Sequence, residues 1–179
     1  MYILRHEVRG SDNSYNSCLT KEGMSNAIKL VDKLTELNIQ HIYCSPFIRA
    51  IQTIHPYSVK NNIKINIDYA LVEYISKPRM CSDINNIIFT NEEMEYWNIN
   101  NKYTSSIKPV ELSFGIDDEA YESIDNMMYR TSRFKEYLNY IKPKNTIIVS
   151  HKDTLNCLWK HYNKTENFLE MGEVVSLYK

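Results

Sequence analysis

The sequence predicts an α/β fold, a three-layer α/β/α sandwich around a mostly parallel central sheet. Short apolar runs alternate with stretches of helical spacing along the chain, and this alternation favours a parallel sheet with helices on both faces. A hydrophobic fraction of 43% and a charged fraction of 24% are ordinary for a globular protein. No repeat, low-complexity block or linker divides the 179 residues, a length that suits one domain. We therefore expect a single domain over residues 1–179.

Two strands and one helix are expected in the first part of the chain. Residues 2–5 and residues 41–45 are short apolar runs that read as buried strands. Thr20 is suited to cap a helix over residues 21–37, because its hydroxyl can accept a hydrogen bond from a free N–H group of the first turn. Apolar residues recur at helical spacing along that stretch, which predicts a helix with one buried face.

A second helix is expected to start at Ser45-Pro46. Serine is a favoured cap, and proline is tolerated at the first helical position, where no N–H group is needed. Pro56 is expected to end this helix, because it has no N–H group to donate. The following stretch IKINI, residues 63–67, alternates apolar and polar side chains, which is typical of a strand.

The remaining chain consists of an irregular segment followed by regular elements. Residues 75–116 are rich in Asn, Ser and Lys; we expect an irregular insertion or lid there, with short helices near residues 83–97. The elements expected after it are a helix over 119–142, a strand over 145–150, a helix over 153–162 and a final strand over 173–178.

The charge balance argues against a polyanionic partner. The formal net charge is −1. The chain therefore lacks the overall positive charge that would attract nucleic acid or an anionic membrane. No apolar run approaches the length of a membrane span and no signal peptide is visible. We expect a cytoplasmic protein that binds neither nucleic acid nor membranes; its oligomeric state is left open.

The cysteines give no sign of a metal or redox site. None of the four forms a C-x-x-C pair, the spacing that would indicate zinc or disulfide chemistry. In a reducing cytosol they are expected to be free thiols, and we expect neither a metal nor a cofactor. They are Cys18, Cys44, Cys81 and Cys157.

Charged and polar residues follow three of the expected strands. Arg5 and His6 end the first strand, Ser45 and Arg49 follow the second, and His151 follows the strand over 145–150. Ligands of parallel sheets bind beyond the carboxyl ends of the strands. If the three strands are neighbours, these side chains converge at one edge of the sheet.

Such a group of side chains suits a phosphate. A helix N-terminus offers free N–H groups and a partial positive charge, and Arg49, about one turn inside, leans back toward the same point. Arg5 supplies a second guanidinium, which binds phosphate oxygens in a bidentate way. Of the two imidazoles, His6 and His151, one can attack phosphorus while the other, as a cation, stabilises the developing charge.

Several motifs resemble those of the histidine phosphatase superfamily, also called phosphoglycerate mutase-like. LRHEVR resembles its Arg-His-Gly signature, LTKEGMSNA its Leu-Thr-x-x-Gly helix start, and CSPFIRAIQT its Ser-Pro-x-x-Arg-Ala-x-Gln-Thr segment. LVEY is similar to the segment that carries the acidic residue, VSHKDTL to the Ser-His-Gly motif, and GEVVSLY to the closing strand. The motifs keep the family's order over residues 2–178.

The resemblance implies a role for each site residue. His6 would be the nucleophile that becomes phosphorylated, and Arg5, Arg49 and His151 would hold the phosphoryl oxygens. Glu73 would protonate the leaving oxygen and then activate water. Other carboxylates remain open for the acidic role, namely Glu22, Glu111 and Glu119.

Two positions depart from the family pattern. Glu7 and Lys152 stand where the family has a glycine after each histidine, and glycine at such turns permits unusual backbone angles or close approach to a ligand. Their charges are opposite, and both follow strand ends. We therefore hypothesise that they form an ion pair on the rim of the site.

The rim of the site holds further candidates for substrate binding. Glu7, Ser45 and Lys152 are placed there by their motifs. Lys77 and Arg79 follow the acidic segment closely. Two interpretations of these residues stay open: contact with a second anionic group of the substrate, or a place in a solvated loop.

The resemblance implies a metal-independent phosphomonoester hydrolase. The substrate would be a phosphorylated small molecule or a phosphoprotein, and activity should fall at acid pH as the nucleophilic histidine protonates. A phosphatase fold that binds a phospho-ligand or a protein partner without turnover is the alternative. A phosphoglycerate mutase is a third option, which the short chain disfavours.

Overall fold

A five-stranded sheet forms the centre of the protein in the computed structural model, which describes residues 1–11, 14–74, 87–108, 122–163 and 169–178. The strand order is β3-β2-β4-β1-β5. All neighbours pair in parallel except β1 and β5, which are antiparallel. The mostly parallel sheet is therefore confirmed. Its strands are β1 (Tyr2–Arg5), β2 (His41–Cys44), β3 (Ile65–Ile67), β4 (Thr146–Ser150) and β5 (Val174–Ser176).

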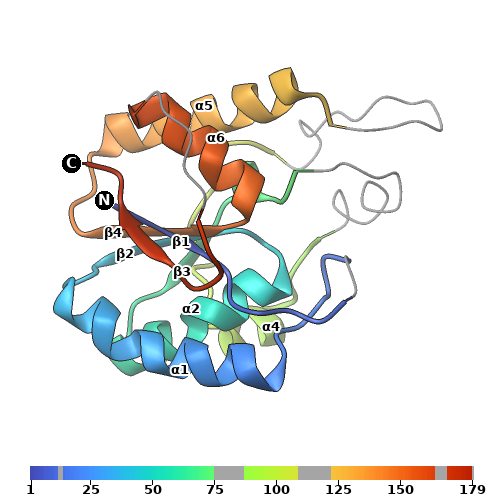
Figure 1. The fold of residues 1–179 in the computed structure, drawn as a ribbon, viewed down its shortest axis with the longest axis vertical. Helices are drawn as coiled ribbons and strands as arrows, with labels where there is room; N and C mark the ends of the chain where they lie inside the picture. The colour runs from blue at the N-terminus through green and yellow to red at the C-terminus, as the bar shows by residue number, and fades with distance from the viewer. Residues whose placement is uncertain (12–13, 75–86, 109–121, 164–168, 179) are drawn as a thin grey trace.

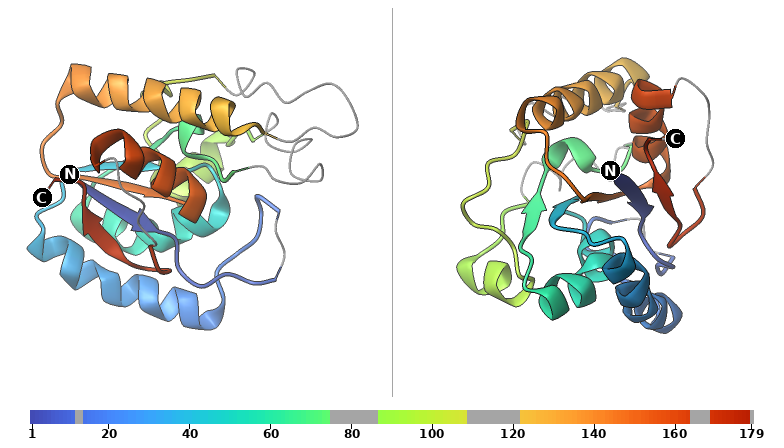
Figure 2. Two further views of the ribbon diagram at one scale, coloured as in Figure 1. Left: turned by 45° about the horizontal axis from the view of Figure 1, so that its top comes forward. Right: turned by 90° about the vertical axis from the view of Figure 1, so that its left-hand side faces the viewer.

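Helices cover both faces of this sheet (Figure 1). The helices α1 (Lys21–Glu36) and α2 (Ile48–Asn61) pack together on one face. The helices α5 (Ile124–Ile141) and α6 (Lys152–Asn163) pack together on the other, as Figure 2 shows in its right-hand view. The predicted three-layer α/β/α sandwich is confirmed.

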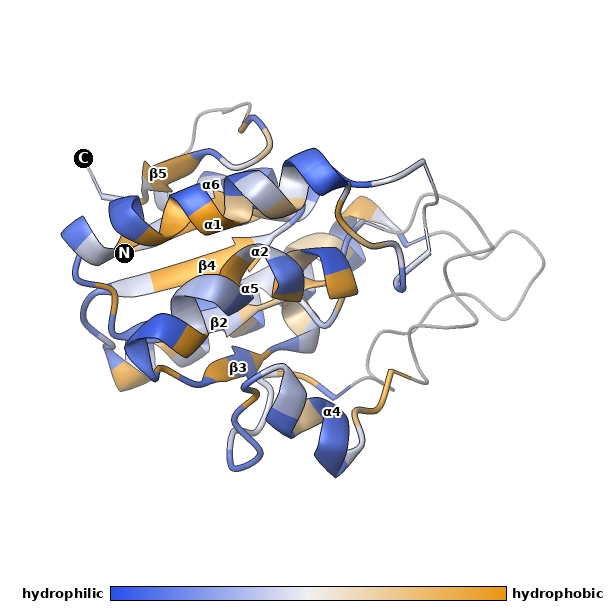
Figure 3. Ribbon diagram, turned by 90° about the horizontal axis from the view of Figure 1, so that it is seen from below, coloured by the Kyte–Doolittle hydropathy of each residue, from blue (hydrophilic) through white to orange (hydrophobic). Residues whose placement is uncertain are grey.

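The hydrophobic core lies on both faces of the central strands. All five residues of β4 are buried, and β4 is drawn in hydrophobic colours in Figure 3. Leu34 of α1 and Ile51 of α2 are fully buried below it, and Phe134 of α5 and Leu158 of α6 are fully buried above it. Apolar residues at helical spacing therefore hold both helical layers to the sheet.

The start of α1 follows the predicted pattern. The Thr20 hydroxyl accepts a hydrogen bond from the Gly23 N–H group, 3.1 Å away, as expected of a cap. Gly23 itself is required by a close approach, because a Cβ atom there would lie 2.2 Å from the backbone oxygen of Val8. The glycine thus lets α1 pack directly against the segment that follows β1.

The helix α2 differs from its prediction at both ends. It begins at Ile48 with Phe47 as the cap, because the Ser45 hydroxyl accepts the Phe47 N–H group and so occupies a turn before the helix. Pro56 lies inside the helix and does not end it. The buried face of the helix, which includes Ile54, offsets the hydrogen bond that proline cannot make.

The described part of the irregular segment packs against β3. Residues 87–108 contain the short helix α4 (Asn91–Tyr96), which lies within the range 83–97 where one or two short helices were predicted. Ile99 pairs with Ile65 of β3, and Phe89 is buried. The rest of the predicted insertion or lid, residues 75–86 and 109–116, lies outside the described residues.

The later elements agree with the sequence in type and approximate position. Helix α5 begins at Ile124 with Ser123 as its cap, a few residues later than predicted. The short 3-10 helix η1 (Tyr69–Leu71) precedes the acidic segment. Among the described helices, none has the length and hydropathy needed to cross a membrane.

Candidate active site

The two motif histidines meet at the carboxyl edge of the sheet. His6 directly follows β1, and its N–H group donates to the Ser150 carbonyl, 3.0 Å away. His151 directly follows the neighbouring strand β4. The two imidazole rings lie edge to face with centroids 5.1 Å apart. The parallel pairing of β1 and β4 therefore brings together residues that are far apart in sequence.

Ser45, after β2, fixes the ring of His151. The Ser45 hydroxyl lies 2.9 Å from His151 Nε2, and Phe47 packs against the same ring at a centroid distance of 4.9 Å. His151 Nδ1 has no hydrogen-bond partner and lies 3.8 Å from Glu73 Oε2. One side of the ring is thus anchored, and the other faces the carboxylate.

Arg49 is fully buried and reaches the same carboxylate. Its guanidinium forms an ion pair with Glu73 and donates to the Ser14 carbonyl at 2.9 Å. The guanidinium carbon also lies 4.6 Å from the centre of the Phe47 ring, close enough for a cation–π contact. Arg49, Glu73 and His151 therefore converge. Glu22 instead lies exposed in the first turn of α1, and Glu111 and Glu119 are outside the described residues.

The segment before Glu73 is held by three side chains. The carbonyls of residues 70–72 accept hydrogen bonds, in order, from Arg130 at 2.5 Å, Ser150 at 2.6 Å and Thr154 at 2.6 Å. All three donors are buried. Because the bonds fall on consecutive residues from three different elements, they fix the direction in which the chain presents Glu73.

Arg130 was missed from the sequence, where it reads as a surface charge on a helix. Its side chain and that of Glu122 are 3% and 1% exposed, and they form a bidentate pair with distances of 2.5 and 2.9 Å. A signal was present, because Arg130 lies three residues after Met127 and four before Phe134 on the buried stripe of α5. A charge on an apolar stripe indicates a buried partner.

The tautomer of His6 follows from one hydrogen bond. His6 Nδ1 lies 2.8 Å from the backbone oxygen of Glu7. A carbonyl only accepts, so Nδ1 carries the proton and Nε2 keeps its lone pair. The pKa of His6 is lowered to about 3, chiefly by burial, and the positive charges of Arg49, Arg5 and Arg9 act in the same direction. The imidazole is therefore neutral at physiological pH.

His151 is neutral in the same way. Burial lowers its pKa well below the usual value, and the charge of Arg49 acts in the same direction. The expectation that one of the two imidazoles stabilises charge as a cation concerns the site with a phosphate bound, and it stays a prediction. A phosphate beside His151 would supply the negative charge that favours its protonated form.

The buried neutral histidines predict a loss of stability in acid. An unfolded histidine binds a proton near pH 6.5, whereas folded His6 stays neutral down to about pH 3. Between these values the unfolded chain binds more protons, so the free energy of unfolding falls as the pH is lowered. We expect His6 to contribute a loss of about 2 kcal/mol between pH 7 and pH 5, and His151 to add to it. Urea unfolding at both pH values measures the loss; equal losses in wild type and His6→Gln would contradict the assignment.

One guanidinium nitrogen of Arg5 forms a hydrogen bond away from Glu73. Its Nη1 donates to the Leu169 carbonyl at 2.8 Å, and its Nε is buried without a hydrogen-bond partner. The Arg5 backbone oxygen accepts from the Gly172 N–H group at 3.0 Å. Arg5 is thus fixed at the end of β1 beside His6, with donor capacity left for an anion.

The hypothesised ion pair between Glu7 and Lys152 is wrong: no ion pair among the described residues joins them. The Glu7 N–H group donates to the Thr53 hydroxyl at 3.0 Å, and its carboxylate lies 3.4 Å from the Asn26 amide. Gly172 leaves room for this carboxylate, since a Cβ atom there would lie 1.9 Å from Glu7 Oε1. Glu7 is therefore packed between α1 and the segment before β5.

The structure describes only one of the three remaining candidates for substrate binding. Lys77 and Arg79 lie outside the described residues. Lys152 is the first residue of α6 and follows His151 directly. Among the described residues, no group of three or more His, Cys, Asp or Glu side chains is arranged to hold a metal ion.

Three solved structures of similar fold are distant from this chain in sequence. The ecdysone phosphate phosphatase of Bombyx mori, solved with tungstate, has a TM-score of 0.68 at 15% identity, over 97% of this chain and 86% of its own. The alpha-ribazole phosphatase of Shigella flexneri has a TM-score of 0.68 at 18% identity, over 97% of this chain and 87% of its own. A mycobacterial glucosyl-3-phosphoglycerate phosphatase has a TM-score of 0.67 at 12% identity, over 97% of this chain and 87% of its own. These likenesses show the fold.

The family assignment comes from the sequence as a whole. The comparison with curated proteins found no match. The family model described as histidine phosphatase superfamily (branch 1) matches residues 2–171, a range that contains both histidines, Arg49 and Glu73. With the fold and the order of the motifs in agreement, the chain belongs to branch 1 of the histidine phosphatase superfamily.

Proposed function

We propose that this protein is a metal-independent phosphomonoester hydrolase that works through a phosphohistidine on His6. The observation that carries the proposal is the arrangement of His6: Nδ1 is tied to a carbonyl 2.8 Å away, so Nε2 has its lone pair available as a nucleophile. The neutral imidazole needs no general base before it attacks.

The phosphate pocket is assigned to Arg5, Arg49 and His151. Arg49 and His151 already converge on one anionic oxygen, Glu73 Oε2. A phosphoryl oxygen carries the same charge and can take the same place between them. Arg5 holds a buried Nε that lacks a hydrogen-bond partner and stands next to the nucleophile. Preorganised donors of this kind stabilise the charge that develops on the transferring group.

Glu73 completes the reaction as acid and then as base. His6 Nε2 forms a bond to phosphorus while the bond to the leaving oxygen breaks. Glu73, which takes up a proton from solvent when the phosphoryl group replaces it between Arg49 and His151, gives that proton to the leaving oxygen. Water then attacks the phosphohistidine, the Glu73 carboxylate takes the proton, and the bond to His6 breaks. Phosphate and an alcohol are released, and both residues return to their starting states.

The substrate is proposed to be a phosphorylated small molecule, with a phosphoprotein as the alternative. The three named structural neighbours are phosphatases of ecdysone phosphate, alpha-ribazole phosphate and glucosyl-3-phosphoglycerate by their names. Their substrates share only a phosphate on a small molecule, which supports the class and no individual compound.

The proposal is tested by trapping the intermediate. Brief reaction with a ³²P-labelled phosphomonoester in EDTA, quenched in alkali, should leave label on the protein that is lost on mild acid treatment, as expected for phosphohistidine. Vanadate should inhibit competitively. Turnover that EDTA abolishes would exclude the metal-independent reaction. Binding of vanadate without turnover would favour the alternative of a non-catalytic module, and conversion of 3-phosphoglycerate to 2-phosphoglycerate would favour the mutase.

A further inference from the structure

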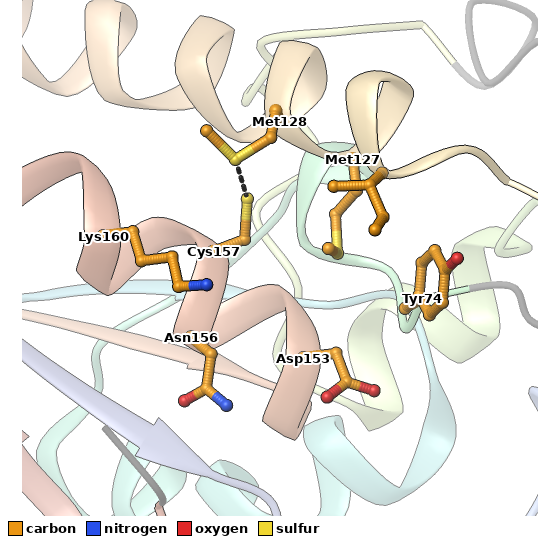
Figure 4. A pocket seen from close by; sticks show the side chains of 8 residues that line it. Tyr74, Met127, Met128, Asp153, Asn156, Cys157 and Lys160 are labelled. Atoms are coloured by element: carbon orange, nitrogen blue, oxygen red, sulfur yellow. Dashed lines mark hydrogen bonds between the residues drawn. The ribbon is translucent and has the colours of Figure 1, made fainter. Parts of the chain in front are cut away.

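A cavity opens between α5 and α6, beside the candidate active site. Its volume is about 370 Å³, within the range of small-molecule pockets, roughly 300–1,000 Å³. Figure 4 shows Tyr74 and Asp153 at one end of it, Met127 near them, and the contact between Met128 and Cys157 farther along the helices. That contact has a sulfur–sulfur distance of 3.1 Å.

Two residues connect this cavity to the reacting groups. Tyr74 directly follows Glu73, and consecutive Cα atoms lie about 3.8 Å apart. Asp153 lies two residues after His151, in the first turn of α6. One end of the cavity is therefore lined by residues one and two positions along the chain from the acid and the phosphate-binding histidine, although neither of these lines it.

The walls of the cavity favour an apolar ligand with a limited polar part. Ile124, Met127, Met128 and Cys157 offer apolar, polarisable surface, and thioethers adapt well to flat rings. The polar part of the lining comes from Tyr74, Asp153, Asn156 and Lys160. The carboxylate of Asp153 can accept a hydrogen bond from a hydroxyl or amide donor on a ligand.

We propose that this cavity binds the leaving group of the substrate, and that this group is an apolar, ring-containing alcohol carrying a hydrogen-bond donor. The inference rests on the proposed phosphatase function, since only a phosphomonoester has a leaving group to place here. A phosphorylated polyol fits poorly, because its hydroxyl groups would lose water against thioethers that cannot replace those hydrogen bonds.

Non-hydrolysable phosphonates test the cavity independently of turnover. We measure by calorimetry the binding of (1-naphthylmethyl)phosphonate and methylphosphonate, which share the anionic group and differ in the ring. The ring should make the naphthyl compound bind at least about tenfold tighter, because burying roughly 60 Å² of apolar surface contributes about 1.5 kcal/mol. Equal affinities in the wild type would overturn the inference.

Two variants and a matched control assign the preference to the cavity. Ile124→Trp fills the cavity from its rim, and Met128→Gln places an amide in its wall; both should remove most of the preference for the ring. Ile124 is 64% exposed and Ile28, on the opposite face in α1, is 63% exposed, so Ile28→Trp is the control and should keep the preference. A preference that survives in both cavity variants would place the ring elsewhere.

The two proposals fail in different ways. If the phosphonate preference is present and is lost in Ile124→Trp, the cavity binds the ring even when no phosphohistidine is trapped, and the hydrolysis is then the part that fails. If phosphohistidine forms but methylphosphonate binds as tightly as the naphthyl compound, hydrolysis stands and the cavity inference is wrong.

Discussion

Replacing His6 with alanine is expected to lower kcat for p-nitrophenyl phosphate by about 10⁴-fold or more, because removal of a nucleophile leaves only the binding groups of the site. His151, the other imidazole of the described site, is not expected to take over the attack, because its Nε2 is already engaged by the Ser45 hydroxyl 2.9 Å away. Steady-state assays with EDTA present measure the change, and the alkali-stable label should disappear with it.

A second histidine provides the control for this variant. His41 is exposed at the start of β2, at the opposite end of that strand from Ser45, so His41→Ala should keep wild-type activity. Thermal unfolding of both variants separates loss of chemistry from loss of fold. His6→Ala that folds and retains full activity would remove His6 from the mechanism and with it the phosphohistidine.

The edge where the site forms could be predicted from the sequence because local signals agreed. The strands at residues 2–5, 41–45 and 145–150 are short apolar runs with polar residues at or directly after their ends. Parallel connections place all such ends on one edge, so the edge could be predicted, whereas the meeting of His6 and His151 depends on β1 and β4 being neighbours, which the structure shows.

Features that depend on tertiary contacts could not be predicted. Pro56 ends a helix by local rules, yet α2 continues because its buried face is held by the sheet and by α1. Glu7 and Lys152 have complementary charges, but Glu7 is packed against Gly172 and Asn26. Sequence shows which charges follow the strand ends and does not show where each side chain turns.

Replacing Arg130 with methionine is expected to lower the free energy of unfolding by about 3–5 kcal/mol, since it removes one partner of a buried ion pair. Glu122, 1% exposed, would lose both bonds of the bidentate contact, and the Ala70 carbonyl would lose its donor. The Ala70 carbonyl belongs to the segment that presents Glu73, so kcat should fall more than KM rises. Urea unfolding and steady-state kinetics measure the two effects.

Two further variants decide whether this loss comes from the buried charge or from the helix. Arg133 lies on the same helix in an ion pair with Glu136, with side chains 51% and 62% exposed; Arg133→Met should cost no more than about 1 kcal/mol, as exposed pairs contribute little. The double variant Arg130→Met/Glu122→Leu removes both charges and should recover much of the stability. It should not recover kcat, because the Ala70 carbonyl still lacks its donor. Recovery of both properties would mean that the buried pair, and not the hydrogen bond to the acidic segment, is what Arg130 supplies to catalysis.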